Sequence, residues 1–221
     1  IKERPLLMRL LTIIITPLLI CLSAEAQGVW YSQSANDFWE NQEVNQVIDP
    51  SNFNQSLLEA ALFHAGNQAR ESKGKKALSW NPILSKSARH QSGLMAKSQK
   101  LSHNWRRPKN SRKLIDSIEL FDGHFKAFGE NIAQFYLLDI PEYENYYFRD
   151  TSFYASDGQK IDNKTYAKLA NECIEAWMNS RGHRENLLHP FLDIGTGVSF
   201  WVKNKKGLNF DIYLSQNFGT P

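Results

Sequence analysis

The part of the chain that best indicates the fold is the stretch Trp177-Met-Asn-Ser-Arg-Gly-His-Arg-Glu-Asn-Leu-Leu188. It follows apolar residues at helical spacing, and Gly182 is the residue type that commonly ends a helix. The pattern predicts that one helix ends at Gly182, that His183 lies just past that end, and that a second, capped helical segment follows. Short punctuated motifs of this kind are more typical of a site than of a core.

Two upstream motifs supply partners for this stretch. Leu101-Ser-His-Asn104 contains His103, and Gly129-Glu-Asn-Ile-Ala133 contains Glu130. Long spacers separate the three motifs, so only the fold can bring them together. We expect residues 129–134 to begin a short helix, with Glu130 near its start.

The apolar spacing outlines the other elements. It predicts a first helix over 55–72, a second that begins at Asn81-Pro82 in N-cap and N1 order, and a third over 164–180. Residues 197–202 and 208–218 have the pattern of two strands, joined by a turn at 203–207. Alternation in the last strand suggests that one of its faces is buried. Early helices and a late hairpin predict an α+β fold without internal repeats.

The composition is that of an ordinary globular protein. The chain has 221 residues, 42% hydrophobic and 12% aromatic, which is enough for one domain with a real core. Its net charge of +3 comes from 26 basic and 23 acidic residues, so a dedicated nucleic-acid-binding protein is not expected.

The N-terminal residues have the pattern of a targeting segment. The apolar run Leu10–Leu22 has the length of a signal peptide and is too short to span a membrane comfortably. Ala24-Glu-Ala26 fits a cleavage site, so residues 1–26 are expected to be removed, with residues 1–7 upstream of a start at Met8. The mature protein would then be secreted or periplasmic, with no membrane span.

Two cysteines refine this prediction. Cys21 would be the lipidated residue of a lipoprotein, but Ile20 stands before it, where a lipidation signal needs a small residue. Cys173 would be the only cysteine after cleavage, so an intramolecular disulfide is impossible. Its helical surroundings indicate a small buried apolar side chain.

Two segments stand outside the main pattern. Residues 27–54 are polar with interspersed aromatics and are expected to form an arm packed on a domain over 55–221. Residues 136–163 form an aromatic-rich insertion. It would either fold down on its own aromatic side chains or form an aromatic lip beside a cleft, suited to sugars or lipids.

Six motifs in one order resemble the CAP superfamily, which comprises cysteine-rich secretory proteins, antigen 5 and pathogenesis-related 1 proteins and is also called the SCP domain, in its disulfide-free bacterial form. The motifs are Asn67 with Arg70; Ala77-Leu-x-Trp-Asn-Pro-x-Leu84; Ala88, Met95 and Ser102-His103; Gly129-Glu-Asn-Ile-Ala133; Trp177 to Leu188; and Ile194-Gly-x-Gly197 with Gln216-Asn-Phe-Gly219. The resemblance implies an α-β-α sandwich, in which a small antiparallel sheet lies between helical layers and a broad cleft opens beside it.

The resemblance also implies a cleft tetrad of two histidines and two acids that can hold a divalent metal, often zinc. The positions that match are His103, His183 and Glu130. The second acid usually lies three residues after the helix tryptophan, where this chain has Ser180. His103 and His183 are therefore the expected metal ligands of a weak site that loses zinc below about pH 6. The alternative is a metal-free, hydrogen-bonded cluster.

Three neighbours of the tetrad have expected roles. Asn131 would satisfy backbone groups, and Asn186 would clamp a loop. Arg184 would pair with a carboxylate or meet an anionic ligand at the rim of the cleft.

Three functions fit these features. The first is an exported binding module whose cleft takes a lipid, a glycan or a peptide. The second is a zinc-assisted hydrolase, such as a peptidase, with Glu130 as general base. The third is a structural or interaction protein of the cell envelope. A binding protein is favoured over an enzyme, because the resemblance and the aromatic insertion support binding and Ser180 in place of the second acid weakens a zinc-assisted reaction. The chain also has neither an H-E-x-x-H nor a G-x-S-x-G motif.

Overall fold

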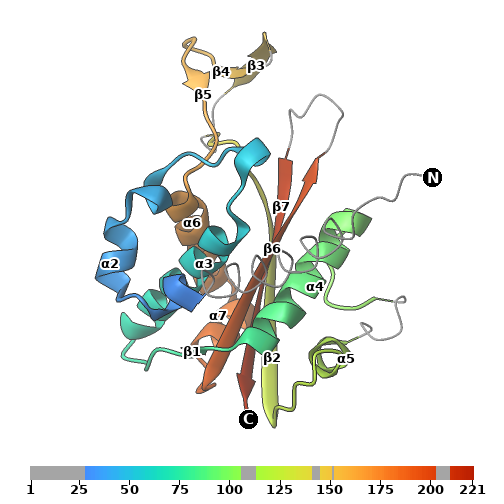
Figure 1. Cartoon of the computed structure of the whole chain (residues 1–221). Coiled ribbons are helices and arrows are strands. Elements are labelled where there is room, and N and C mark those ends of the chain that lie inside the picture. The colour runs from blue at the N-terminus through green and yellow to red at the C-terminus, as the bar shows by residue number, and fades with distance from the viewer. Residues whose placement is uncertain (1–27, 106–112, 141–144, 151, 203–209) are drawn as a thin grey trace, which may run out of the picture.

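The computed structural model describes residues 28–105, 113–140, 145–150, 152–202 and 210–221. The expected signal peptide and the turn at 203–207 lie outside these ranges. The helices labelled in Figure 1 are α2 (Ala35–Glu40), α3 (Gln55–Glu71), α4 (Pro82–Ser98), α5 (Leu114–Glu119), α6 (Tyr166–Asn179) and α7 (Arg181–Leu188). The 3-10 turns η2 (Gln42–Asn45) and η3 (Pro50–Asn52) lie between α2 and α3.

The strands form two sheets. They are β1 (Ser79–Trp80), β2 (Ala127–Tyr136), β3 (Tyr146–Arg149), β4 (Ser152–Ala155), β5 (Lys160–Ile161), β6 (Asp193–Val202) and β7 (Phe210–Thr220). The main sheet has the order β1-β6-β7-β2, in which β7 pairs antiparallel with both neighbours and β1 pairs parallel with β6.

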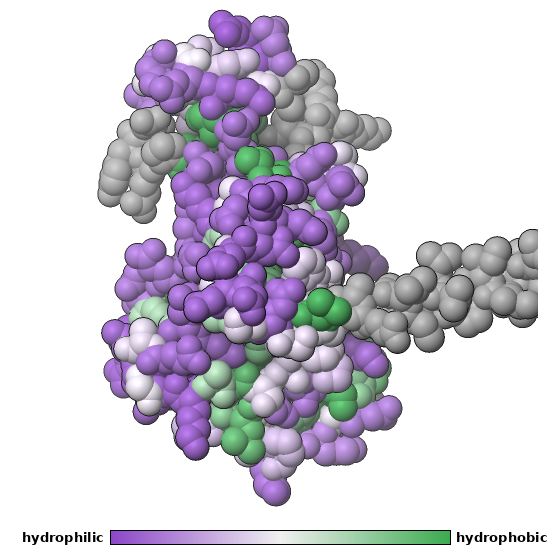
Figure 2. All heavy atoms as spheres, turned by 60° about the vertical axis from the view of Figure 1, so that its left-hand side comes forward, coloured by the Kyte–Doolittle hydropathy of each residue, from purple (hydrophilic) through white to green (hydrophobic). Residues whose placement is uncertain are grey.

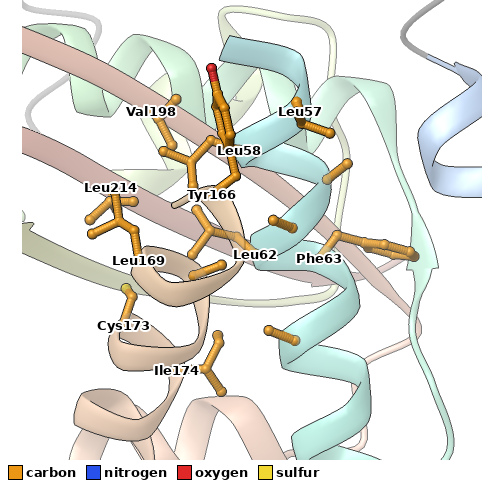
Figure 3. Packing of buried hydrophobic residues seen from close by; sticks show 14 of the residues in the cluster. Leu57, Leu58, Leu62, Phe63, Tyr166, Leu169, Cys173, Ile174, Val198 and Leu214 are labelled. Carbon is orange, nitrogen blue, oxygen red and sulfur yellow. The ribbon is translucent and has the colours of Figure 1, made fainter. Parts of the chain in front are cut away.

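Helices cover both faces of the main sheet, which confirms the α-β-α sandwich (Figure 1). On one face Met95 of α4 packs with Tyr213 of β7 and Ile132 of β2. On the other face, leucines of α3 and α6 and the cysteine of α6 pack with Val198 and Leu214 of the sheet (Figure 3). The prediction that only one face of the last strand is buried was wrong. Residues 211–219 are all buried, because a helical layer lies over each face.

Two glycines set the distance between α4 and the sheet. A Cβ atom on Gly195 would lie 2.1 Å from the backbone nitrogen of Ser85, and one on Gly197 would lie 2.2 Å from the backbone of Ala88 and Arg89. These neighbours are backbone atoms, which cannot rotate away. Only glycine therefore allows α4 to pack this closely on β6.

The predicted helix boundaries of α3 and α4 are confirmed. Asn81 caps α4 with its side-chain oxygen, which accepts the N–H groups of Ile83 and Leu84, and Pro82 occupies the first helical position. Asn54 caps α3 in the same way. Cys173 of α6 is buried and unpaired in the core, as expected, and burial raises the pKa of its thiol.

Residues 28–54 are part of the main core. Phe38 is fully buried and stacks on the His64 ring of α3 at a centroid distance of 4.1 Å. Tyr31 stacks on Trp80 at a ring-centroid distance of 4.6 Å.

Figure 2 shows that the face on the α2 side is mostly hydrophilic, with hydrophobic residues in small separate patches. None of the helices in the described ranges is both long and apolar enough to cross a bilayer.

The aromatic insertion forms a second sheet, β3-β4-β5, that stands away from the body (Figure 1). Its base is held by Lys164, whose backbone N–H donates to the carbonyl of Leu137 and whose Nζ donates to the carbonyl of Leu138. The insertion leaves the main sheet at the end of β2, roughly 20 Å along the strand from Glu130 at about 3.3 Å per residue. The aromatic side chains therefore do not line the region around Glu130.

The close packing at Gly197 gives a stability test. We expect Gly197→Ala to lower the free energy of unfolding by about 1–3 kcal/mol or more, because the new methyl group meets backbone of α4. Gly182→Ala, in α7, is the control, because a Cβ there meets nothing within 4 Å and alanine favours a helix. Urea unfolding measures both. Equal stability of the Gly197→Ala variant and the unchanged protein would contradict the assignment.

Candidate functional site

The Glu130 segment is a strand, not the start of a helix. Residues 127–136 pair with β7 over ten positions, with Glu130 opposite Asn217. The helix prediction was wrong because long-range pairing with a buried strand overrides local propensity. Strand alternation places Glu130 and Ile132 on the α4 face of the sheet.

The Trp177–Leu188 stretch also differs from the prediction. Helix α6 ends at Asn179, and Ser180 is at once its C-cap and the N-cap of α7. Gly182 and His183 therefore lie inside the first turns of α7 rather than at a helix end. The backbone N–H of Ser180 closes α6, and its carbonyl accepts the N–H of Arg184, so one residue joins the two helices.

The centre of the site is a hydrogen bond between His103 and Glu130. The Nδ1 atom of His103 lies 2.8 Å from Oε1 of Glu130. The Glu130 side chain is only 6% exposed, whereas that of His103 is 49% exposed. With the proton of a neutral ring on Nδ1, the Nε2 lone pair of His103 is available to a ligand.

The two groups change each other's protonation. The hydrogen bond to Glu130 raises the pKa of His103, against the smaller opposite effect of burial. Burial raises the pKa of Glu130 more than the bond from His103 lowers it. The pKa values of His103 and Glu130 are therefore both raised, so each group holds its proton more tightly than it would in water.

His183 approaches this pair from α7. Burial lowers the pKa of its imidazole, and the positive charge of His103 lowers it further. The His183 ring lies 6.3 Å from that of Trp177, centroid to centroid. Asn131, next to Glu130 in β2, donates to the backbone carbonyl of His183, and His103 bonds Glu130. The structure thus brings His103, Glu130 and His183 into one region, although long spacers separate them in sequence.

Asn131 and Asn186 hold α7 against β2. Asn131 Nδ2 donates to the carbonyl of His183 at 3.0 Å. Asn186 Nδ2 donates to the carbonyl of Glu130 and to Oδ1 of Asn131, both at 3.0 Å. The clamp role expected for Asn186 is confirmed. Asn131 also satisfies backbone, although it does so from a strand.

Arg184 makes no ion pair with a carboxylate of the described residues, so the first of its two expected roles is not observed. Its Nη1 donates to the carbonyl of Met178 at 2.7 Å, which ties α7 to the end of α6. Ser180, at the position of the family's second acid, makes no side-chain capping bond to α7. Its side chain carries no charge.

Gln91 is a site residue that the sequence analysis missed. It is buried on the sheet side of α4, and its Nε2 donates to the carbonyl of Ser102 at 2.6 Å. Its Oε1 accepts the indole N–H of Trp105 at 2.8 Å. Gln91 therefore holds the chain on both sides of His103. Its spacing from Ala88 and Met95 on one helix face was the available signal.

The donor set fits at most a partial metal site. Among the described residues, no group of three or more His, Cys, Asp or Glu side chains is arranged to hold a metal ion. His103 could offer Nε2 and His183 a ring nitrogen, while Glu130 is engaged with His103. Two imidazoles completed by water would bind zinc less tightly than a closed four-ligand site.

The remaining motif residues outside the site are structural. Asn67 exchanges two hydrogen bonds with the backbone of Leu78. Arg70 donates to the carbonyls of Lys76, Leu187 and His189. Both side chains therefore hold the ends of α3, β1 and α7 together.

We expect Gln91→Leu to release the His103 segment from α4. The change leaves the carbonyl of Ser102 and the indole of Trp105 without their partner and costs about 1–3 kcal/mol of stability. Amides of residues 101–105 should exchange faster with solvent, and the Trp105 indole N–H signal should move. The exposed Gln68, changed to leucine, is the control. Unchanged exchange in the Gln91→Leu variant would refute this role.

Solved structures provide a comparison for the fold. An extracellular protein containing an SCP domain from Bacillus anthracis str. Ames matches with a TM-score of 0.50 and 21% identity over 76% of this chain and 41% of that one. An outer surface protein from Borrelia burgdorferi matches with a TM-score of 0.47 and 17% identity over 72% of this chain and 89% of that one. The first of these shares the arrangement of helices and sheet described above.

Comparison of sequences identifies the family. The chain is 30% identical over 153 residues to the uncharacterized protein YkwD of Bacillus subtilis (strain 168), covering 67% of this chain and 46% of that protein. It thus spans less than half of that relative's length. The family model described as CAP, the cysteine-rich secretory protein family, matches residues 63–218. Because that match covers most of the chain, this protein belongs to the CAP superfamily.

Proposed function

We propose that this protein is an exported CAP-domain binding module, with His103 and His183 as the groups that contact a polar ligand. The observation that carries the proposal is the His103–Glu130 pair. A buried carboxylate fixes the orientation of a half-exposed imidazole, whose second nitrogen is left for a ligand. Such a pair holds a hydrogen-bonding group in one geometry before binding, which lowers the entropic cost of association.

Export is the part of this proposal that rests on the N-terminal sequence. The apolar run before Ala26 has the form of a signal peptide. The similar protein from Bacillus anthracis is described as extracellular. Both observations support export of a mature chain that begins at Gln27.

The position of Glu130 argues against its acting as a general base. A general base must reach a water molecule or a substrate hydroxyl group. The Glu130 side chain is 6% exposed and accepts from His103, so its role is to orient that ring. We therefore favour binding over zinc-assisted hydrolysis as the function of the site.

Weak divalent-metal binding is part of the proposal. His103 and His183 would hold the ion, and Glu130 would act on it through the His103 ring. The ion would supply an electrophilic centre for an oxygen or nitrogen atom of the ligand. Zinc titration calorimetry at pH 7.5 on the protein without residues 1–26 should show weak saturable binding.

The matched variants make that titration decisive. Binding should be lost in the His103→Ala/His183→Ala double variant and retained in His124→Ala, which changes an exposed histidine outside the site. Equal binding in the double variant would place the metal elsewhere. Absence of binding in the unchanged protein would leave a metal-free cluster as the correct description.

The pKa shift of His103 predicts the pH dependence of zinc binding. Zinc needs the neutral imidazole, and the bond to Glu130 raises the pKa of His103 above its ordinary 6.5. Falling pH should therefore weaken binding at a higher pH than the value near 6 expected for unperturbed histidines. The pKa of His183 is lowered, so His183 should take up its proton at a lower pH than His103 does.

The Glu130→Gln variant tests whether Glu130 causes this pH dependence of zinc binding. The amide oxygen can still accept from His103 but carries no charge, so the loss of zinc binding should move to lower pH. Affinity at high pH should fall about 10–100-fold, as is usual when a carboxylate behind a histidine ligand is removed. A pH midpoint that does not move would show that Glu130 does not control the protonation of His103.

A further inference from the structure

A pocket lies beside the first residues of α3 and α6. Its volume is about 500 Å³, within the range of small-molecule sites. Residues of η2, η3 and the first turn of α3 line it, together with Arg89 of α4 and Tyr166 of α6. None of its lining residues is His103, Glu130 or His183, so it is separate from the site described above.

One wall of this pocket is an aromatic ring held in place. Phe53 lies nearly parallel to Tyr166, with ring centroids 6.0 Å apart and an angle of 10° between the planes. Phe200 meets the Phe53 ring edge-on, with ring centroids 4.1 Å apart. Phe53 is only partly buried, so part of its ring remains open to a ligand.

Amide side chains make up much of the rest of the lining. They are Gln46, Asn52, Asn54 and Gln55. Gln46 and Asn52 are exposed and make no side-chain hydrogen bond within the described part of the chain. Asn54 uses its Oδ1 to cap α3, and Gln55 uses its Nε2 to bind Glu59, so each keeps its other amide atom.

Two further polar groups are fixed at the pocket. The Tyr166 hydroxyl accepts the backbone N–H of Asn54 at 2.9 Å, which leaves its own proton to donate. The Arg89 guanidinium is held by both carboxylate oxygens of Glu59, through Nε at 2.9 and 2.8 Å. Both groups are thus oriented before any ligand enters.

The charge of the pocket disfavours an anion. The buried Glu59 neutralises Arg89, and Glu43 on the pocket wall adds a negative charge. The ligand best matched to the lining is neutral and has many hydroxyl groups. Asparagine and glutamine amides both donate to and accept from hydroxyl groups, and an aromatic face packs against the apolar face of a sugar ring.

We propose that this pocket binds a short neutral oligosaccharide. Phe53 packs against one sugar ring, while Gln46 and Asn52 hydrogen-bond its hydroxyl groups. This proposal does not rest on the function proposed for His103 and His183. The exposed Tyr146, Tyr147 and Phe148 of the small sheet stand at the same end of the molecule, where they can meet a longer chain (Figure 1).

Amide NMR titration of the full mature chain tests the proposal, with the trisaccharide of N-acetylglucosamine and maltotriose as probes. We expect saturable shifts at residues 52–57 with at least one of them, and no shift at His103 or His183. The Gln46→Ala/Asn52→Ala double variant should weaken binding about tenfold, since it removes two side chains that would hydrogen-bond the sugar hydroxyl groups.

The control is Gln42→Ala, which changes an exposed glutamine of the same 3-10 turn that does not line the pocket. It should bind the sugar as the unchanged chain does, and thermal unfolding should show that each variant is folded. Lack of a saturable shift with either sugar would overturn the proposal, as would unchanged binding in the double variant. Saturable shifts of the same amides with inorganic phosphate alone would identify an anion site instead.

Discussion

The packing of α4 on Gly195 and Gly197 of β6 fixes the position of the helix that leads to His103. It sets the separation between a helix and the sheet at the distance of backbone contact. The His103 segment follows the end of α4, and Glu130 stands on the sheet face that α4 covers. A hydrogen bond of 2.8 Å between them is possible only if that separation is fixed. Small residues in the sheet therefore determine the geometry of the site, although none of them would touch a ligand.

A second constraint is the closure of the edge of β2. The sheet ends at this strand, and an open edge would expose backbone groups that invite pairing with another chain. Trp177 donates its indole N–H to the carbonyl of Ile132, and Asn186 donates to that of Glu130. The Trp177–Leu188 stretch therefore has two roles: it covers the edge with α6 and α7, and it brings His183 to the strand that carries Glu130.

The sequence predicted those features that depend on local chemistry. Asn81-Pro82 could be recognised as a helix start because a capping side chain and a fixed φ angle act within three residues. The strand at Glu130 and the shared cap at Ser180 could not, because pairing with β7 and packing of α7 decide them. His103, Glu130 and His183 were identified by resemblance to a family. Gln91 was missed because a buried glutamine on a helix shows its importance only when its partners, Ser102 and Trp105, are known.

The balance of charge in the site explains why a missing acid matters. Ser180 adds no charge, so Glu130 is the carboxylate that faces His103 in the described site. When His103 is protonated, the pair is neutral and its buried carboxylate is compensated. A divalent cation in place of that proton would leave one positive charge, which an anionic or strongly polar group of a ligand would have to offset. A proton and a metal ion would therefore compete for the same imidazole, and the raised pKa of His103 would favour the proton as the pH falls.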